Sequence, residues 1–447
     1  MVGGGISGLV CAYALRKSGI DAQLVEASPR PGGVINSVSR DGFLLELGPQ
    51  SFSGTAAIRE LSADLGISNE LLQAPPHAPR YVLIDGKLAP APLSPPAFFL
   101  SSMINGATKW ALLRDIFGKS IPPNADESVA AFVRRKFSSQ LLDRLVGPFV
   151  SGVYAGDPER LSVRSAFPTL YEAEKASGSI VRGMMRIAKS KKGPRERPTL
   201  QTFREGNETL VRSLAKNLGP ALRTETKVLG ISRQNDGTFA LSLEKPDGTE
   251  SVSTKSLIFA TPTDITGSLL SQLDASFASP LSSIEYAAVA VVSLGYRQQD
   301  VGHSLNGFGF LVPRSSGLRV LGSVWNSSLF PGRTPEGHAL LTSFVGGATD
   351  PAATKLKPEE LAALVHREIS PVLSMKSDPV FSNVTIWPRA LPQYNLGHSD
   401  RLAAIAKSCS RFPGLWLTGN YLQGPAIGSC VDQALAIAEE VRKKLAA

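Results

Sequence analysis

The pattern of apolar and polar positions changes several times along the chain. At the N-terminus it predicts a very short strand, a helix from Gly5 to Lys17, and a second strand at 22–26. Residues 53–72 then place leucines and an isoleucine at helical spacing. A strand–helix–strand start of this kind is typical of an α/β nucleotide-binding fold.

The middle and the end of the chain follow other patterns. Residues 93–190 hold helical stretches such as 128–146, whereas 285–350 is rich in strands. Asn235-Asp236-Gly237 interrupts the alternating stretch 228–243, which predicts a hairpin. A strand at 415–418 and a helix at about 429–444 close the chain. We therefore expect an α/β plus α+β protein with discontinuous domains.

The composition is typical of a globular protein with a large apolar core, and the charge is distributed unevenly along the chain. The chain has 447 residues, 43% of them apolar, and a net charge of +9. Two thirds of this excess lies between Arg182 and Arg197, which suits an acidic lipid surface, a nucleic acid or a carboxylate-bearing substrate, or is a solvated loop. The uncharged stretch 88–108 contains four prolines, so it favours shallow insertion in a membrane interface over a spanning helix.

Cysteines and histidines predict no metal site. Cys11, Cys409 and Cys430 form no CxxC pair, and the five histidines are scattered along the chain. An odd and low number of cysteines fits a reducing compartment. No apolar segment typical of a signal peptide stands at the start, so we expect a cytoplasmic location.

The first chemical motif is Gly3-Gly4-Gly5-Ile6-Ser7-Gly8, which matches GxGxxG. Gly3 permits a tight turn, Gly5 lets the backbone approach a pyrophosphate, and Gly8 lets the helix pack closely on the sheet. Glu26 ends the second strand, where a carboxylate accepts hydrogen bonds from ribose hydroxyls. Only Met1 and Val2 precede the glycines, so we expect either a native start upstream or a first strand that has lost ladder bonds.

A second motif favours FAD over NAD. Glu26-Ala-Ser-Pro-Arg30-Pro-Gly32-Gly33-Val34 follows the strand directly, and Gly48-Pro49-Gln50-Ser51 comes about fifteen residues later. Arg30 is predicted to pair with a phosphate, and the double glycine lets the chain pass close to a ligand. An NAD site needs no such continuation, whereas the longer FAD molecule needs contacts strung along it.

A third motif lies at the far end of the chain. Gly419-Asn420 ends a strand, and Gly424-Pro425-Ala426-Ile427-Gly428 leads into the last helix. The N-terminus of that helix is predicted to face the flavin or the pyrophosphate, where its dipole favours negative charge. Cys430 in the first turn is either an activated thiol or, more simply, a small packing residue.

With these motifs the chain resembles the flavin amine oxidase superfamily and, within it, the family of protoporphyrinogen oxidases with its coproporphyrinogen III oxidase branch. The narrower resemblance rests on three stretches, Gly147–Pro168, Gly307–Pro313 and Phe344–Gly347. It implies three domains: an FAD domain (1–73, 202–264 and 383–447), a substrate domain with a mixed sheet (74–92 and 265–382), and a helical membrane-binding domain (93–201).

The resemblance also implies the reaction. A porphyrinogen loses six electrons and six hydrogens to become the aromatic porphyrin, by hydride transfer to flavin N5, and oxygen becomes hydrogen peroxide. Protoporphyrinogen IX is the expected substrate, coproporphyrinogen III the alternative. The implied partners are the substrate, molecular oxygen and a membrane surface (the bacterial inner membrane or an organelle), with no nucleic acid; a homodimer stays open.

Individual residues are carried over by the same resemblance. Arg80 matches an arginine that binds a substrate propionate, and Gly152 a backbone carbonyl near the reacting bridge. The walls that sandwich the macrocycle match Phe308, Leu311, Val324 and Phe344. On the cofactor side, Val228 matches an adenine contact and Trp387 an FAD-side residue. No protein acid or base is implied.

Two departures from the family pattern put residue roles in doubt. Pro425 stands where valine is frequent, and Glu205-Gly206 where two glycines are common. Open alternatives are a carotenoid desaturase, an amine oxidase with FAD attached through Cys430, and a membrane-associated scaffold that binds flavin without catalysis.

Overall fold

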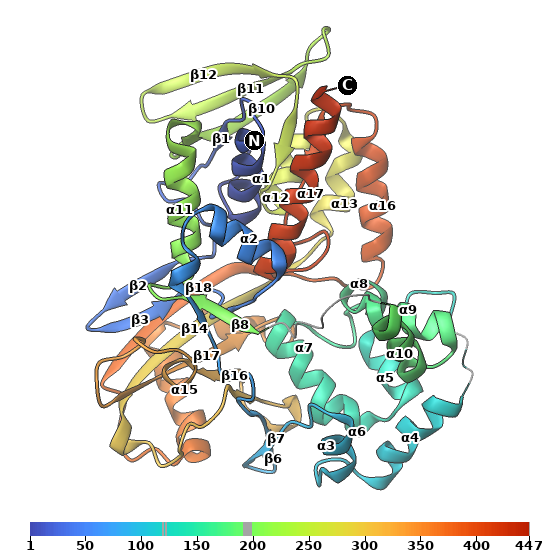
Figure 1. Cartoon of the computed structure of the whole chain (residues 1–447), viewed down its shortest axis with the longest axis vertical. Coiled ribbons are helices and arrows are strands. Elements are labelled where there is room, and N and C mark those ends of the chain that lie inside the picture. The colour runs from blue at the N-terminus through green and yellow to red at the C-terminus, as the bar shows by residue number, and fades with distance from the viewer. Residues whose placement is uncertain (119, 121–122, 191–198, 447) are drawn as a thin grey trace.

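A computed structural model describes residues 1–118, 120, 123–190 and 199–446. Figure 1 shows three parts: an α/β part at the top, a large sheet at the lower left, and a group of helices at the lower right. These parts resemble the three expected domains in content, although their exact ranges stay a prediction. Position 383 falls inside strand β18 (Phe381–Pro392), which belongs to the large sheet.

The top part is built on short parallel strands. β1 (Leu24–Val25) pairs with β9 (Leu222–Arg223), and β13 (Leu257–Phe259) pairs with β19 (Leu415–Leu417). Val2 joins the two pairs, because it forms parallel bridges to Val25 and to Phe259. The first strand is therefore very short but retains ladder bonds on both sides, among them Val2 N–H to Ile258 O (2.9 Å) and Gly3 N–H to Val25 O (2.9 Å).

Helices pack on these strands around one apolar core. α1 (Ile6–Lys17) and α17 (Ile427–Ala446) lie side by side in Figure 1, next to α11 (Glu208–Leu218). Leu9, Leu214 and Val431 are completely buried between them. The predicted helix at 429–444 and the helix at 5–17 are both confirmed within two residues.

The helix expected over 53–72 is wrong at both ends. The structure has β4 (Phe52–Ser53), α2 (Ala56–Asp64), a 3₁₀ turn (Ser68–Glu70) and β5 (Leu71–Gln73). Thr55 caps α2 by accepting a bond from Ile58 N–H, and Gly66 at φ +72° stops its continuation. Both strands pair with β8 (Leu200–Phe203), a long-range partner that helical spacing cannot reveal.

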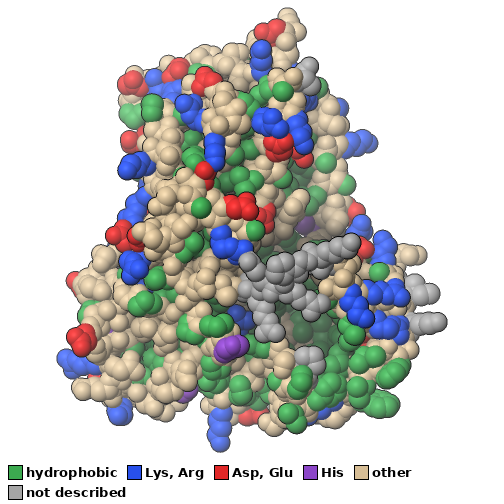
Figure 2. Space-filling view, in the orientation of Figure 1, with side chains coloured by type: hydrophobic (Ala, Val, Ile, Leu, Met, Phe, Trp, Pro, Cys, Tyr) green, Lys and Arg blue, Asp and Glu red, His purple; other side chains and the backbone are tan. Residues whose placement is uncertain are grey.

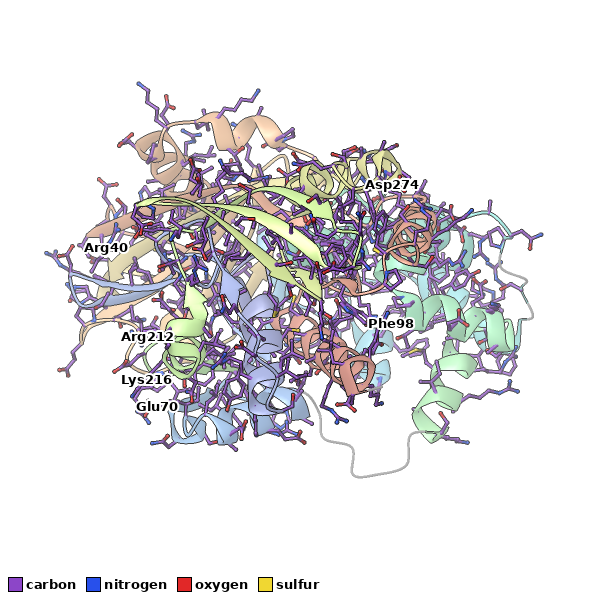
Figure 3. The ribbon with its side chains drawn as sticks, turned by 90° about the horizontal axis from the view of Figure 1, so that it is seen from above. Arg40, Glu70, Phe98, Arg212, Lys216 and Asp274 are labelled. Atoms are coloured by element: carbon purple, nitrogen blue, oxygen red, sulfur yellow. The ribbon has the colours of Figure 1, made fainter. Side chains whose placement is uncertain are left out.

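The predicted hairpin is confirmed and extends to a third strand. β10 (Lys227–Arg233), β11 (Phe239–Lys245) and β12 (Gly248–Thr254) form an antiparallel sheet, with Gly237 at φ +82° in the first turn. Figure 3, seen from above, shows this sheet lying over the α/β part, with α11 beside it, marked by Arg212 and Lys216.

The large sheet has seven strands in the order β18-β14-β17-β16-β15-β6-β7. Only the β15–β6 pair is parallel. α15 (Pro358–Leu373) packs against the sheet, where Val365 and Trp325 are fully buried in one core. The strand-rich character predicted for 285–350 is confirmed. The sheet consists of β6 (Arg80–Ile84), β7 (Lys87–Pro90), β14 (Tyr286–Arg297), β15 (Gly309–Leu311), β16 (Val320–Trp325), β17 (His338–Gly346) and β18.

The helical part is confirmed in type but is more broken than expected. The stretch 128–146 is not one helix, because α5 ends at Lys136 and Ser138 caps a new start by accepting from Leu141 N–H. A π-helical turn (Leu142–Val146) then leads into α7. Its helices are α3 (Pro95–Leu100), α4 (Gly106–Phe117), α5 (Val129–Lys136), α6 (Ser139–Leu141), α7 (Gly147–Tyr154), α8 (Val163–Ala166), α9 (Pro168–Ser177) and α10 (Ile180–Ser190).

The remaining elements connect these parts. They are β2 (Ser37–Arg40), β3 (Phe43–Glu46), α12 (Thr263–Leu270), α13 (Ala278–Ser282), α14 (Asn326–Leu329) and α16 (His398–Cys409).

Candidate active site

The three glycines of the first motif have different surroundings. A Cβ on Gly8 would lie 2.0 Å from the Gly3 carbonyl oxygen, and one on Gly3 would lie 2.8 Å from Thr261 Cγ2. A Cβ on Gly5 would meet nothing within 4 Å. Gly3 and Gly8 therefore serve packing of α1, whereas Gly5 presents bare backbone to open space, as an approaching phosphate requires.

The N-terminus of α1 lies at this open position. Gly5 is the N-cap residue and offers no side-chain cap, so the N–H groups of the first turn, at Ile6, Ser7 and Gly8, are suited to an anion. Glu26 directly follows β1 beside this turn, with Gly4 N–H donating to Oε2 at 2.6 Å. Ser28 donates to Oε1 through its backbone N–H (2.8 Å) and its hydroxyl (2.6 Å). A carboxylate accepts about four hydrogen bonds, so Glu26 retains capacity for a ribose hydroxyl.

The double-glycine segment lies directly against the first turn. Gly32 and Gly5 form a parallel bridge, and Gly32 N–H donates to Gly4 O at 2.7 Å. A Cβ on Gly48 would lie 2.1 Å from Val34 O, so the segment 48–51 packs against it as well. Two motifs that are about fifteen residues apart thus form one continuous backbone surface.

Arg30 makes contacts that its predicted phosphate role does not include. Its guanidinium donates to the carbonyl groups of Pro31 (2.8 Å), Ile35 (2.8 Å) and Gly33 (2.6 Å), and it pairs with Glu208 at 3.3 Å. In this structure Arg30 holds the double-glycine loop in shape, and its contact with a phosphate stays a prediction.

Side chains from three parts of the molecule hold the segment Gly48-Pro49-Gln50-Ser51. Trp387 Nε1–H of β18 donates to Leu47 O (2.6 Å), and Asn207 Nδ2–H donates to Pro49 O (2.7 Å). Gln50 donates to Gly48 O, while Asn326 Nδ2–H donates to Gln50 Oε1 at 2.7 Å. Trp387 therefore lies beside this segment, as its predicted role on the cofactor side requires.

A buried charged group that the motifs did not single out supports the same segment. Glu46 is buried and accepts bonds from Ser37 Oγ–H (2.7 Å) and Asn207 N–H (2.8 Å). The buried Arg333 guanidinium lies 3.8 Å away. Burial raises the pKa of Glu46 to about 7, against the opposing effects of Ser37 and Arg333.

The C-terminal motif meets the first one. A Cβ on Gly428 would lie 2.9 Å from Thr55 Cγ2, and Cys430 of α17 is buried in the core that it shares with Ile6 and Leu9 of α1. Pro425 and Ala426 lie on the partly exposed stretch before α17, and Ile427 turns into the core beside α1. Burial raises the pKa of Cys430 to about 11, so this thiol is a packing residue and not an activated nucleophile.

Together these segments fit an FAD molecule. The open backbone at Gly5, the carboxylate of Glu26 and the closely packed glycines 32, 33 and 48 form a track of suitable chemistry. Val228 is buried in one cluster with Val2 and Val25, on the side where the adenine is expected. Among the described residues, no group of three or more histidine, cysteine or acidic side chains could hold a metal ion.

The predicted substrate residues lie on neighbouring strands of the large sheet. Arg80, Gly309 and Val324 are paired in one row across β6, β15 and β16. Two residues further along, Leu311, Gly322 and Phe344 form the next row. A separation of two residues returns to the same face of a sheet, so Arg80, Leu311, Val324 and Phe344 share one face.

Helix α7 covers this face. A Cβ on Gly152 would lie 2.4 Å from Leu311 Cδ2, so the absence of a side chain at Gly152 lets α7 approach β15. Phe308 precedes β15, packs with Val324 and lies under the Arg80 guanidinium, whose carbon is 5.4 Å from the ring centre. Gly152 meets Leu311, and Phe344 packs in one cluster with Ala155, directly after α7. Phe308 and Val324 pack instead on a neighbouring cluster of Ala74, Leu329 and Phe330.

Comparison with known proteins agrees with this geometry. The family model described as flavin containing amine oxidoreductase matches residues 6–442. The chain belongs to this family. As a flavin containing amine oxidoreductase it uses FAD as its cofactor and is an oxidase.

Named relatives of this amine oxidoreductase carry narrower names. The chloroplastic protoporphyrinogen oxidase of Nicotiana tabacum is 36% identical over 468 residues, covering 99% of this chain and 84% of the relative. The coproporphyrinogen III oxidase of Bacillus subtilis is 30% identical, covering 98% and 96%. A solved structure from Exiguobacterium sp. 255-15, provisionally described as a protoporphyrinogen oxidase, has a TM-score of 0.82 at 23% identity, covering 99% and 98%, and shows the fold alone.

Proposed function

We propose that this enzyme oxidises protoporphyrinogen IX to protoporphyrin IX in heme biosynthesis, with coproporphyrinogen III as the alternative substrate. The observation that carries the proposal is the apolar face of Leu311, Val324 and Phe344 beneath α7, with Arg80 on the same face. Such a face suits a wide, apolar macrocycle with charged edges. The names of the tobacco and Bacillus relatives point to the same two substrates.

The residues of this site act mainly by positioning. When bound, FAD supplies the hydride acceptor at its N5 atom, and oxygen reoxidises it. The apolar side chains exclude water and hold the ring, while the guanidinium of Arg80 is placed to pair with a carboxylate at its edge. No side chain is assigned as acid or base, because gain of aromaticity supplies much of the driving force and pyrrole protons pass to solvent.

Turnover of the two porphyrinogens tests the substrate. We expect faster turnover of protoporphyrinogen IX, measured as oxygen uptake and porphyrin fluorescence with the purified holoenzyme. Faster turnover of coproporphyrinogen III would favour the alternative. If the enzyme oxidised neither porphyrinogen, the proposal would be contradicted.

Arg80→Gln is expected to raise KM about tenfold by loss of one charged hydrogen bond. Arg212→Gln, an exposed change on α11, is the matched control and should leave KM unchanged.

We further propose that the helical part contacts a membrane surface from the cytoplasmic side. Large apolar side chains are exposed on α3, α4 and α10: Leu100 (85%), Trp110 (67%), Phe117 (82%) and Met185 (55%). Figure 2 shows hydrophobic side chains gathered at the lower right, where Figure 1 places α3 and α4. An exposed patch of this kind marks an interaction site. No helix among the described residues is long and apolar enough to span a membrane.

Basic side chains flank this apolar patch. Arg186 and Lys189 of α10 are described, and they suit acidic headgroups. Arg182 is engaged within the protein, since it donates to the carbonyl groups of Ile116 (2.7 Å) and Gly118 (2.6 Å). The other basic residues predicted for this contact, Lys191, Lys192, Arg195 and Arg197, lie outside the described residues.

A further inference from the structure

The segment 393–398 links the two sides of the active site. It follows β18, which carries Trp387, and it leads into α16. On one side lies the helical part with α7 and Gly152; on the other lies the C-terminal glycine segment 419–428. None of the sequence motifs singled out this connection.

Contacts to the helical part are mostly made by the backbone. Ser162 N–H donates to Tyr394 O (2.8 Å), and Leu396 N–H donates to Arg160 O (2.9 Å). The buried Gln393 side chain donates through Nε2 to Tyr154 O at 2.9 Å. Tyr154 is the last residue of α7, two positions after Gly152, so the end of the helix that faces the substrate is tied to Gln393.

Contacts to the glycine segment are made by two aromatic side chains. The Tyr394 hydroxyl donates to Asn420 O. His398 Nε2 lies 2.9 Å from Tyr421 O, which fixes the tautomer with a proton on Nε2. The two rings stack with their centres 4.4 Å apart and their planes within 10°. Tyr394 is 2% exposed and His398 is 1% exposed.

This geometry gives Tyr394 an unusual place in the molecule. Its ring packs in the core of the helical part with Tyr154, at 6.1 Å between ring centres, while its hydroxyl bonds Asn420 O at the start of the loop between Gly419 and α17. A buried carbonyl that loses its donor carries the full cost of its desolvation. Removing the hydroxyl therefore releases the loop without changing the packing of the ring.

We propose that Tyr394 is a positioning residue that holds the cofactor-side loop at Asn420 in register with the substrate-side helix α7. The proposal rests on the proposed placement of FAD at 419–428 and of the substrate at Gly152. Hydride transfer requires the two to be aligned within a fraction of an ångström, and a single rigid side chain that contacts both supplies such alignment. Tyr394 does not touch the substrate in this scheme.

The test is Tyr394→Phe in the full chain, with three measurements. First, FAD binding to apoprotein, followed by flavin fluorescence, is expected to weaken about tenfold, because the loop must now be ordered at the expense of binding energy. Second, kcat is expected to fall about tenfold with KM changed less than twofold, because alignment and not substrate binding is lost. Third, thermal unfolding reports the purely structural cost.

Tyr296→Phe is the matched control. Tyr296 is fully buried in the core of the large sheet, and its hydroxyl is hydrogen-bonded to His366 Nδ1 at 2.9 Å, away from α7 and from the glycine segment. Both variants are expected to lose similar thermal stability, and only Tyr394→Phe to change FAD binding and kcat. Equal FAD affinity and kcat in the two variants would overturn the proposal. Since FAD binding is measured without substrate, this result is independent of which porphyrinogen the enzyme oxidises.

Discussion

At the scale of single residues, Gly5 and Gly8 of the first turn have different predicted roles. Gly5 is assigned to cofactor binding and Gly8 to the packing of α1. Gly5→Ala places its Cβ in open space, and its φ of −69° suits alanine, so the apoprotein should lose less than about 1 kcal/mol of stability. FAD affinity should fall by about tenfold or more, because the methyl group occupies the phosphate approach. Urea unfolding of the apoprotein and flavin fluorescence titration measure the two effects.

Gly8→Ala is the counterpart of that experiment. Its Cβ would lie 2.0 Å from the Gly3 carbonyl oxygen, so α1 must shift, and we expect a loss of about 1–3 kcal/mol of stability even without cofactor. If Gly5→Ala destabilised the apoprotein as much as Gly8→Ala does, the assignment of Gly5 to the cofactor would fail.

His398 predicts a pH dependence of stability. Burial lowers its pKa to about 4, with Arg401 adding to the effect and the bond to Tyr421 and the charge of Asp126 opposing it. The unfolded chain therefore binds a proton between pH 6.5 and 4 that the folded chain does not. Stability is fully present above pH 6.5 and is lost as the pH falls toward 4, by about 3 kcal/mol.

His398→Gln should remove this part of the pH dependence while keeping a donor for Tyr421 O. Urea unfolding between pH 4 and 7.5 measures it, with the exposed His77→Gln as control. An unchanged slope in His398→Gln would show that the imidazole does not titrate in this range.

The sequence motifs predicted the positions of residues next to the first turn. They did not predict the buried polar side chains that hold the surrounding segments in place. Gly5 and Glu26 have roles set by local spacing after a strand. Glu46, Arg333 and Tyr394 stand in no motif, because Arg333 pairs with the distant Glu46 and Tyr394 bonds Asn420, 26 positions along the chain. The motif position of Arg30 did not reveal its bonds to the carbonyl groups of Ile35 and Gly33, and its phosphate contact stays a prediction.

At the scale of elements, prediction worked where the pattern was local. The hairpin at Asn235–Gly237 and the strands of the large sheet follow from turn chemistry and alternation. It failed at 53–72 and at 128–146, where helical spacing continues across a positive-φ glycine or a serine cap. In both places a distant partner or a new cap decided where the element ends.

A buried charge network holds three helices of the helical part together. Lys136 of α5 lies 2.6 Å from Asp115 of α4 and 3.3 Å from Glu174 of α9, all of them buried. Lys136→Met leaves two buried carboxylates without this partner, so we expect a loss of about 3–5 kcal/mol in chemical denaturation.

Arg134→Met, two residues earlier on α5, is the control for that network. Arg134 pairs with Glu159 at the surface, where both side chains are about half exposed, so its loss should cost about 0–1 kcal/mol. Similar losses in the two variants would mean that the buried network does not hold the helices.

At the scale of the whole molecule, the chain builds its site from segments that are more than 400 residues apart. Ile6 of α1 and Cys430 of α17 are buried in one core, and Val2 bridges β1 and β13, the latter paired with the last strand β19. The large sheet and the helices are inserted between these ends. Contacts between the cofactor side and the substrate side include those of Gln50 with Asn326, of Leu47 with Trp387 and of Tyr394 with Asn420. The spacing of the motifs predicted that the N-terminal and C-terminal glycine segments meet. It did not predict that the segment 393–398 connects them to the helical part.

The exposed apolar face gives a final prediction about the molecule as a whole. Phe98 is only partly exposed and packs on the helical core, so replacing it would test folding as much as membrane contact. Leu100 and Phe117 are 85% and 82% exposed, and the double change to serine should leave thermal stability nearly unchanged. Each side chain that becomes buried in the membrane contributes about 1.5–3 kcal/mol to binding. Binding to vesicles containing acidic lipids, measured by sedimentation, should therefore weaken at least tenfold.

Leu93→Ser, at a side chain that is 64% exposed, is a milder change and should weaken vesicle binding less. If the double variant sediments with vesicles as well as the unchanged protein does, or if it instead converts a dimer to a monomer, this face is not a membrane contact.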